Sequence, residues 1–330
     1  MQPEVVGRVQ HLRVYPVKSA GALEIERNGE FTPELPEVLL TPSGVETLQG
    51  VKDHWFLFVR AEAEGGIHQK ITQRDKRDKQ DRTQGFSDLA HIRPQWRNGD
   101  LYLTWDGEDP ILVPLDNNSG RPVAVDIWRD ICVGVDQGDQ LNQWASAHLN
   151  YPVLFVKADG PFERKARQNY KKNNNDMLTH DGYPVHFLNE ASVVELNKKG
   201  RELAEASNGK IIFEQIEWES FRPQMVFTDM PAQYEYLIGQ GSVAGVLFED
   251  PKPCGRCTIP RVNWRTGEIK KLDPNTILAT YMRWIDIDGD MQTIFGENML
   301  PVETGTVAVG AKVVTLNKRN PALTYGGKNS

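Results

Sequence analysis

The chain has few cysteines, no long hydrophobic run and no excess of positive charge. Three cysteines among 330 residues cannot build a disulfide framework, which fits a reducing compartment. No apolar run approaches the roughly 18 residues that cross a membrane. The first ten residues form neither a secretory signal nor a basic transit helix. We therefore expect a cytoplasmic protein that has no membrane partner.

The net charge of -7 opposes general binding to a nucleic-acid polymer, and none is expected as a partner. The composition, with 39% hydrophobic and 25% charged residues, is ordinary for a folded globular protein. A chain of this length is long enough for two domains, each with its own core.

Hydrophobic patterning predicts a β-rich first part and a mixed second part. The predicted helices are Asp139–Leu149 and Glu190–Ala206. The predicted strands are Val9–Val14, Trp55–Val59, Leu101–Trp105, Ile111–Leu115, Val123–Trp128, Ile211–Ile216, Gln224–Phe227, Val246–Phe248 and Thr306–Leu316. The basic segment 161–176 is predicted to be a solvated loop. Strands and helices do not alternate regularly, and no glycine-rich nucleotide loop opens a helix. These features favour an α+β fold with barrel-like antiparallel sheets over a doubly wound parallel sheet.

Two of the three cysteines, Cys254 and Cys257, lie three residues apart with Arg256 between them. Thiolates near positive charge bind soft metals or carry out redox chemistry. The spacing alone is consistent with half of a zinc site, a dithiol redox pair or a single thiolate ligand to a transition metal. The residues that follow, up to Gly267, favour strand, turn and strand, which opposes a dithiol at a helix start. A zinc site lacks a second cysteine pair or suitably spaced histidines. Two inert buried cysteines remain an alternative, and these residues do not name a metal.

Several short segments, in their order along the chain, resemble the MOSC family, named for the C-terminal domain of molybdenum cofactor sulfurase. They are Val14–Ser19, Asp53–Leu57, Thr72–Arg74, Asp181–Pro184, Asn189–Ser192, Phe221–Pro223, Cys254–Cys257, Phe295–Asn298 and Gly305–Gly310. The chain is most similar to the branch that contains the mitochondrial amidoxime reducing component and its bacterial counterparts. The resemblance implies an N-terminal MOSC-type β-barrel domain over 4–128, a MOSC domain over 136–316 with mostly antiparallel barrel-like sheet and flanking helices, and a tail over 317–330.

The resemblance also implies a molybdenum cofactor, a pterin dithiolene that carries a phosphate, and no pyridoxal phosphate. Cys257 matches the cysteine that ligates molybdenum, and Arg256 beside it is expected to favour the thiolate. Lys18, Ser19 and Arg222 match residues that bind the phosphate or the pterin. Further cofactor-binding residues expected from the match are His54, Gly182, Tyr183, Gln224, Gly255 and Asn298. The sequence departs from the family pattern at His54, Gln224, Asn263 and Tyr236, and its Gly182 and Tyr183 match the bacterial form.

The activity that the resemblance implies is reduction of N-hydroxylated compounds: amidoximes, hydroxylamines and N-hydroxylated bases. No cysteine follows Cys257 to hold an iron–sulfur cluster, so electrons are expected from a separate soluble partner of ferredoxin, flavoprotein or cytochrome type. The basic stretch 164–172 is a candidate docking site for an acidic donor. Candidate proton donors are His180, Asp181 and Glu235. Two alternatives stay open: a cofactor carrier or sulfur-transfer protein, and an interaction module that has lost the metal.

Overall fold

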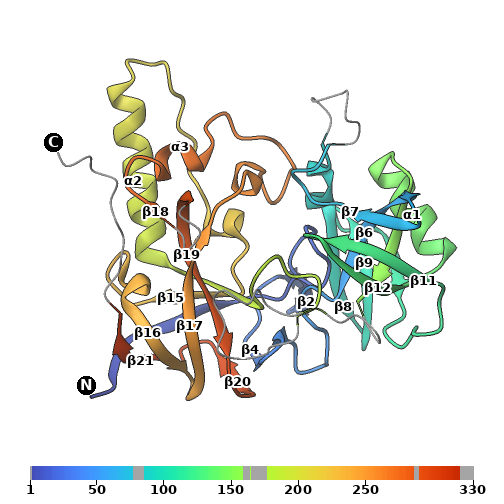
Figure 1. Cartoon of the computed structure of the whole chain (residues 1–330), viewed down its shortest axis with the longest axis horizontal. Helices are drawn as coiled ribbons and strands as arrows, with labels where there is room; N and C mark the ends of the chain where they lie inside the picture. Colours follow the sequence, from blue (N-terminus) through green and yellow to red (C-terminus); the bar gives the residue numbers. More distant parts are fainter. Residues whose placement is uncertain (1, 77–84, 159–163, 165–176, 286–289, 320–330) are drawn as a thin grey trace.

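The computed structural model describes residues 2–76, 85–158, 164, 177–285 and 290–319. Figure 1 shows two lobes side by side, one mainly blue to green and the other mainly yellow to red. The first strand of the chain, in dark blue, lies in the second lobe. The chain therefore begins and ends in the same lobe and builds the other lobe in between.

Seven strands of the second lobe form a closed ring, because β14 pairs with both β15 and β19. In ring order these strands are β14 (Val185–Asn189), β15 (Met225–Thr228), β1 (Glu4–Leu12), β21 (Lys312–Lys318), β16 (Ile238–Val243), β17 (Val246–Gly255) and β19 (Met291–Pro301). A short strand, β18 (Arg283–Ile285), adds to β19. Only the β14–β15 pair among these is parallel. The predicted barrel-like, mostly antiparallel sheet is confirmed.

Apart from the ring and β18, the described strands form a closed barrel of five strands and two further sheets. The barrel consists of β11 (Pro122–Ile127), β12 (Asp130–Asp136), β13 (Val153–Lys157), β6 (Phe56–Glu64) and β7 (Ile67–Lys70). One sheet contains β10 (Glu108–Val113), β9 (Asp100–Trp105), β8 (Ile92–Arg97), β2 (Glu24–Arg27) and β3 (Glu30–Thr32). The other contains β20 (Gly305–Ala308), β4 (Glu37–Thr41) and β5 (Gly44–Glu46). β20 comes from the end of the chain, so this sheet ties the two lobes together.

Three α-helices occur in the described part of the chain: α1 (Asp139–Leu149), α2 (Glu190–Ala206) and α3 (Pro274–Leu278). The first two have the predicted bounds. Asn189 caps α2, since its side-chain oxygen accepts a hydrogen bond from the amide of Ala191 at 3.1 Å. Short 3-10 turns lie at η1 (Ser87–His91), η3 (Trp218–Phe221), η4 (Tyr234–Leu237) and η5 (Ile259–Arg261).

The predicted strand Ile211–Ile216 is wrong, because the backbone N–H and C=O of Ile216 bind a side chain of α2 and not another strand. The Asn197 side chain donates to the carbonyl of Ile216 and accepts from its amide, each at 2.8 Å. The segment therefore lies along α2 instead of joining the sheet. The predicted strand Thr306–Leu316 is two strands, β20 and β21, and β21 continues to Lys318. The predicted loop 161–176 falls outside the described residues except for Arg164.

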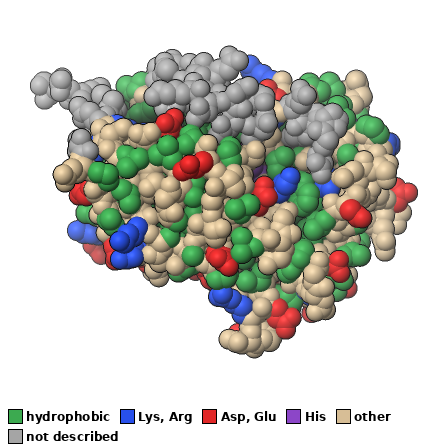
Figure 2. Space-filling view, turned by 90° about the horizontal axis from the view of Figure 1, so that it is seen from below, with side chains coloured by type: hydrophobic (Ala, Val, Ile, Leu, Met, Phe, Trp, Pro, Cys, Tyr) green, Lys and Arg blue, Asp and Glu red, His purple; other side chains and the backbone are tan. Residues whose placement is uncertain are grey.

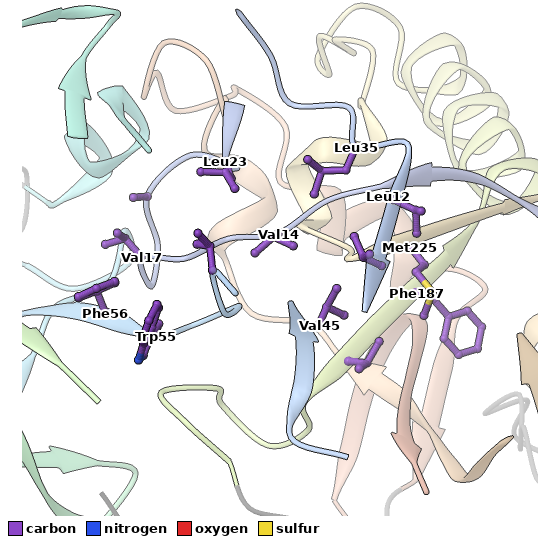
Figure 3. Packing of buried hydrophobic residues seen from close by; sticks show 14 of the residues in the cluster. Leu12, Val14, Val17, Leu23, Leu35, Val45, Trp55, Phe56, Phe187 and Met225 are labelled. Atoms are coloured by element: carbon purple, nitrogen blue, oxygen red, sulfur yellow. The ribbon is translucent and has the colours of Figure 1, made fainter. Parts of the chain in front are cut away.

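One hydrophobic core runs from the ring of the second lobe into the first lobe (Figure 3). Leu12, Phe187 and Met225 belong to ring strands, while Val17 and Phe56 lie where the first lobe begins. The link that leaves β1 is buried along this core, so it holds the residues after it in a fixed place. Charged side chains of both signs are interspersed on the face shown in Figure 2. None of the helices in the described residues has the length and apolar character needed to cross a membrane.

Candidate functional site

A cavity of about 390 Å³ brings together every residue that is predicted to bind the cofactor or the metal. These residues are Lys18, Ser19, His54, Gly182, Tyr183, Arg222, Gln224, Gly255, Arg256, Cys257 and Asn298. They come from six separate stretches of the chain, and the cavity has contributions from both lobes. We call Lys18, Ser19, His54 and Arg222 the cationic wall, and Cys254 to Cys257 the thiol wall. What the cavity binds stays a prediction.

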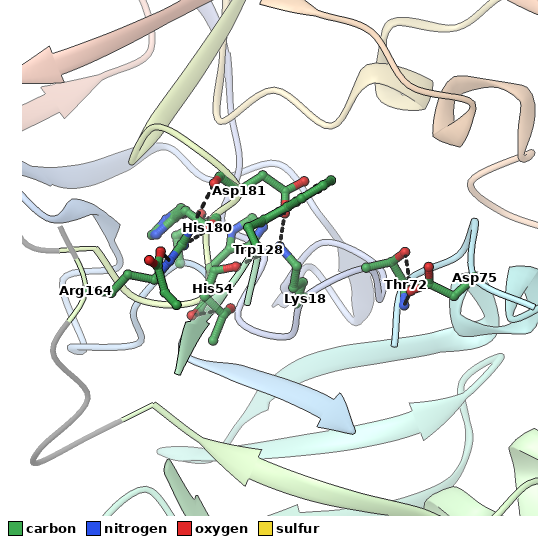
Figure 4. A network of polar contacts seen from close by, with 11 residues as sticks. Lys18, His54, Thr72, Asp75, Trp128, Arg164, His180 and Asp181 are labelled. Atoms are coloured by element: carbon green, nitrogen blue, oxygen red, sulfur yellow. Dashed lines mark hydrogen bonds and ion pairs between the residues drawn. The ribbon is translucent and has the colours of Figure 1, made fainter. Parts of the chain in front are cut away.

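Lys18 anchors the cationic wall as a buried cation (Figure 4). Its side chain is 3% exposed, and its Nζ donates to the Thr179 carbonyl at 2.7 Å and to Asp181 Oδ1 at 2.6 Å. The Trp128 indole donates to the same carboxylate oxygen at 2.8 Å. Burial lowers the pKa of Lys18, and the charge of Asp181 opposes that shift. The ion pair thus keeps a lysine charged at the edge of a cavity.

His54 and Gln224 are held by one carboxylate, Asp53, which lies outside the cavity lining. Asp53 Oδ2 accepts hydrogen bonds from His54 Nδ1 at 2.5 Å and Gln224 Nε2 at 2.9 Å. The Gln224 side-chain oxygen accepts from the backbone amide of His186 at 2.8 Å, so both ends of that side-chain amide are fixed. Asp53 was not among the predicted site residues, although it stands next to His54 in a segment that carries the resemblance.

Arg222 supplies an unpartnered buried donor. Its backbone is left-handed, with φ 56°, and this turns the side chain back over the Tyr15 ring, 4.4 Å from the ring centre. One guanidinium nitrogen donates to the Ala20 carbonyl. The other, Nη2, is buried and has no hydrogen-bond partner among the described residues. Burial lowers the pKa of Arg222 from its ordinary value. An unpaired buried guanidinium N–H is costly, and an anionic ligand in the cavity would satisfy it.

The thiol wall differs from the expectation at Arg256. Its Nη1 donates to Cys254 Sγ at 3.0 Å and to His186 Nε2 at 3.3 Å, so the cation lies against Cys254 instead of Cys257. Burial and the Arg256 charge lower the pKa of His186 to about 3, and this imidazole is neutral. Its Nδ1 donates to the Glu297 carbonyl at 3.1 Å, which leaves Nε2 as the acceptor for Arg256.

Cys257 has a fixed backbone and an uncommitted sulfur. Asn275 donates to the Cys257 carbonyl at 2.8 Å, and Thr293 in turn donates to the Asn275 amide oxygen at 3.1 Å. No hydrogen bond to the Cys257 thiol occurs within the described residues. The three cysteines are unbridged. Gly255 lines the cavity as expected, and a Cβ there would lie 2.1 Å from Gln292 Oε1, so a larger residue would need the Gln292 side chain to move.

The candidate proton donors separate in the structure. His180 and Asp181 line the cavity, whereas Glu235 is buried near the start of α2, where it accepts from Ser192 at 2.7 Å. Burial lowers the pKa of His180 to about 4. Burial alone would raise the pKa of Asp181, but the charge of Lys18 and the hydrogen bonds from Lys18 and Trp128 together outweigh it and hold that pKa below its usual range. Neither cavity residue is therefore a ready acid at neutral pH.

Other lining residues escaped the sequence analysis. They are Thr72, Trp128, His186, Phe221, Lys252, Pro253, Cys254, Ile259 and Gln292, of which Thr72, Phe221 and Cys254 stand in segments that carry the resemblance but had no predicted role in binding. Trp128 has a left-handed backbone, with φ 56°, a rare state for a large side chain and not one that a sequence pattern announces. Within the predicted basic stretch, Arg164 is described and is structural: its guanidinium donates to Asp130 and to the carbonyls of His180 and Asp181.

Comparisons with known proteins agree with this architecture. The MOSC N-terminal beta barrel domain matches residues 6–152, and the MOSC domain matches residues 174–314. Mitochondrial amidoxime-reducing component 1 of Danio rerio is 25% identical over 221 residues, which are 65% of this chain and 64% of that protein. The Xenopus laevis component 1 is 21% identical over 327 residues, which are 95% of this chain and 83% of that protein.

A second kind of relative is molybdenum cofactor sulfurase. The Drosophila melanogaster protein is 25% identical over 282 residues, which are 81% of this chain but 30% of the sulfurase. The chain thus spans less than two thirds of the Danio rerio relative and less than a third of the sulfurase. Both kinds of relative are named for molybdenum cofactor or amidoxime chemistry. On its two matched domains, this chain belongs to the MOSC family.

Proposed function

We propose that this protein binds molybdenum cofactor in the cavity and reduces N-hydroxylated compounds. The observation that carries the proposal is the placement of two unlike groups around one cavity of about 390 Å³. Cys257 offers a sulfur without a hydrogen-bond partner among the described residues. Lys18 and Arg222 offer buried positive charge. A soft thiolate suits a transition metal, and buried cationic donors suit a phosphate.

The residues present fit the cofactor, because the buried Arg222 Nη2 has no hydrogen-bond partner among the described residues and a phosphate oxygen would accept from it. Lys18, Ser19 and Arg222 would hold the phosphate and pterin, and Cys257 would ligate the metal. Gln224, His54 and Asn298 would hold the heterocycle through hydrogen bonds. Gly182 leaves open space, because a Cβ there would meet nothing within 4 Å. When bound, the cofactor supplies the two-electron chemistry that breaks an N–O bond.

The overall reaction consumes two electrons and two protons: the N–OH group loses its oxygen as water, and the nitrogen gains hydrogen. The electrons are proposed to come from a separate soluble redox protein. The protons are proposed to come from solvent that enters the cavity, because Asp181 is held as an anion and Glu235 lies elsewhere. The residues of this chain would then bind, orient and shield the reacting groups.

Two measurements test the proposal. Purified protein is assayed for molybdenum and for pterin, and a fully loaded sample is supplied with a chemical reductant and benzamidoxime. We expect one molybdenum and one pterin per chain and formation of benzamidine. A loaded sample that forms no benzamidine would exclude the reductase.

A second candidate function is a cofactor carrier or sulfur-transfer protein. It is favoured by the contact of Arg256 with Cys254, which gives the cavity a second sulfur beside a cation, and by the sulfurase relatives. A carrier would release its cofactor to an acceptor protein and show no benzamidoxime turnover. Transfer of pterin to an apo-molybdoenzyme without turnover would therefore support this candidate over the reductase.

A further inference from the structure

The Asp53 carboxylate connects four separate segments behind the cationic wall. Its side chain is 0% exposed. Oδ1 accepts from the amide of Tyr15 at 2.6 Å, and Oδ2 accepts from His54, His180 and Gln224 at 2.5, 3.1 and 2.9 Å. Four accepted hydrogen bonds fill the capacity of a carboxylate.

The partners of Asp53 stand next to the residues that face the cavity. Tyr15 precedes Lys18 by three residues on the same link, and Gln224 follows Arg222 by two. His180 precedes Asp181, which pairs with Lys18. One buried group therefore fixes the relative positions of several parts of the cationic wall, because each hydrogen bond holds a different segment in place.

The charge of Asp53 is unexpected behind a wall suited to an anion. Burial alone would raise its pKa, but the charge of His54 and the hydrogen bonds from His180 and His54 outweigh burial and hold that pKa well below its usual range. A permanent carboxylate near the cavity opposes binding of a phosphate unless a cation balances it.

His54 is the group placed to provide that balance. It contacts Asp53 directly and lines the cavity, and its ring stacks on His180 with ring centres 4.6 Å apart. His180 cannot share the task, since burial lowers its pKa to about 4 and leaves it neutral. Imidazole is the side chain that changes charge between pH 5 and 8. The charged groups around this pair are Lys18, Lys70, Arg164 and Arg222 on the positive side and Asp53 and Asp181 on the negative side.

We propose that Asp53 is the positioning residue of the cationic wall and that, through His54, it links anion binding in the cavity to uptake of one proton. With His54 neutral, the Asp53 charge opposes the anion. With His54 protonated, the His54–Asp53 pair carries no net charge, and the hydrogen-bond donors of the cationic wall attract the anion. The inference deepens the proposed function, since the anion meant is the cofactor phosphate.

Sulfate binding to cofactor-free protein tests the linkage, because sulfate keeps a constant charge between pH 5.5 and 8.5. Dissociation constants are measured by NMR titration at half-unit steps of pH. We expect binding to weaken severalfold as pH rises. His54→Gln should remove the pH dependence, and His54→Arg, with its permanent charge, should keep the tight binding at pH 8. Asp53→Asn should alter the pH dependence, because it removes the charge that His54 balances.

A matched control separates positioning from stability. Asp136 is a second buried carboxylate hub, which accepts from Gly138 at 3.0 Å, Asn142 at 2.8 Å and Arg121 at 2.9 Å outside the cavity. Asp136→Asn should lower the thermal midpoint of unfolding and leave the sulfate profile unchanged. If Asp53→Asn does not fold, His54→Gln carries the test, because it leaves the hydrogen bonds of Tyr15 and Gln224 in place.

The sulfate profiles also show what would overturn the inference. Unchanged pH dependence in His54→Gln, a wild-type pH dependence in Asp53→Asn, or no sulfate binding at any pH would each contradict it. The assay needs neither cofactor nor turnover, so a protein that fails to reduce benzamidoxime can still pass this test. A protein that fails this test can equally still be a reductase.

Discussion

The two walls of the cavity are built on opposite principles. Lys18 of the cationic wall and Asp53 behind it are almost fully buried, and both side chains bind partners from distant segments. In the thiol wall, Cys254 and Cys257 are partly exposed, and Cys257 keeps its sulfur free of hydrogen bonds within the described residues. One wall is fixed before any ligand arrives, and the other keeps a reactive atom available.

This difference suits a ligand with two unlike ends. A phosphate gains most from preorganised donors, because charged hydrogen bonds depend on geometry and low dielectric. A metal gains most from a ligand atom whose lone pairs are not already engaged. Substitutions in the thiol wall are therefore expected to lose the metal, and substitutions in the cationic wall to lose the phosphate-bearing part of the ligand.

The largest expected effect is the loss of metal in Cys257→Ala. Removing a ligand atom should cost more than the roughly 10- to 100-fold in metal affinity that loss of an outer-shell partner costs. Cys254→Ala removes a sulfur that Arg256 already engages, so at most a tenfold or so loss is expected. Molybdenum per chain, measured by elemental analysis, checks this. Equal losses in both variants would indicate that both thiolates ligate the metal.

The next effect is the loss of pterin in Lys18→Met. Methionine keeps the bulk of the side chain and removes the charge, so phosphate affinity should fall about 10- to 100-fold, because a hydrogen bond to a charged group contributes about 1.5–3 kcal/mol. Lys157→Met is the matched control. Lys157 is also buried, and it donates to Asn118 at 2.8 Å away from the cavity. Pterin fluorescence of purified protein is the measurement, and equal pterin loss in both variants would contradict a specific role for Lys18.

The two walls also differed in how far the sequence could predict them. Cys254 and Cys257 stand out by rarity and spacing, so the thiol wall is visible in the sequence. What spacing could not give is the direction of the Arg256 side chain, which donates to Cys254 and to the neutral His186 on β14, a strand separated from β17 by β19.

Local sequence patterns do not predict the cationic wall, because its residues are brought together by contacts between distant segments. Lys18 was selected only through a family resemblance, and its partner Asp181 lies 163 residues away. Asp53 was passed over since a single aspartate before a strand carries no local signal. In the fold, helices α1 and α2 were predicted with correct bounds from periodicity, whereas the strand Ile211–Ile216 failed because Asn197 competes for its backbone.

A smaller effect should separate the two thiols of cofactor-free protein. In Arg256→Met, alkylation of Cys254 by iodoacetamide should slow severalfold at neutral pH, because a nearby cation stabilises the thiolate that reacts. The rate at Cys257 should stay the same, and so should both rates in Arg261→Met, where the lost guanidinium binds the Lys270 carbonyl. Labelling is followed by peptide mass spectrometry. A slower Cys257 in Arg256→Met would restore the original expectation for Arg256.

The smallest effect concerns a buried acid outside both walls, which should affect stability and not binding. Burial raises the pKa of Glu235 to about 7, against hydrogen bonds from Ser192 and Asn189 that lower it. The folded protein therefore holds this proton up to about pH 7, while the unfolded chain releases it near the ordinary glutamate pKa of 4.5. Stability from this group is lost as pH rises through that window, by at most about 1.4 kcal/mol per pH unit.

Glu235→Gln cannot ionise, so its thermal midpoint relative to the wild type should be higher at pH 8 than at pH 5. The difference between the two proteins is the informative quantity, because His180 and His186 have lowered pKa values and change stability in the opposite direction. Both histidines contribute equally to the two proteins and cancel in that difference. Scanning calorimetry provides the midpoints, and sulfate binding should be the same in both proteins. A difference that is independent of pH would mean that Glu235 ionises in the folded state as easily as in the unfolded chain.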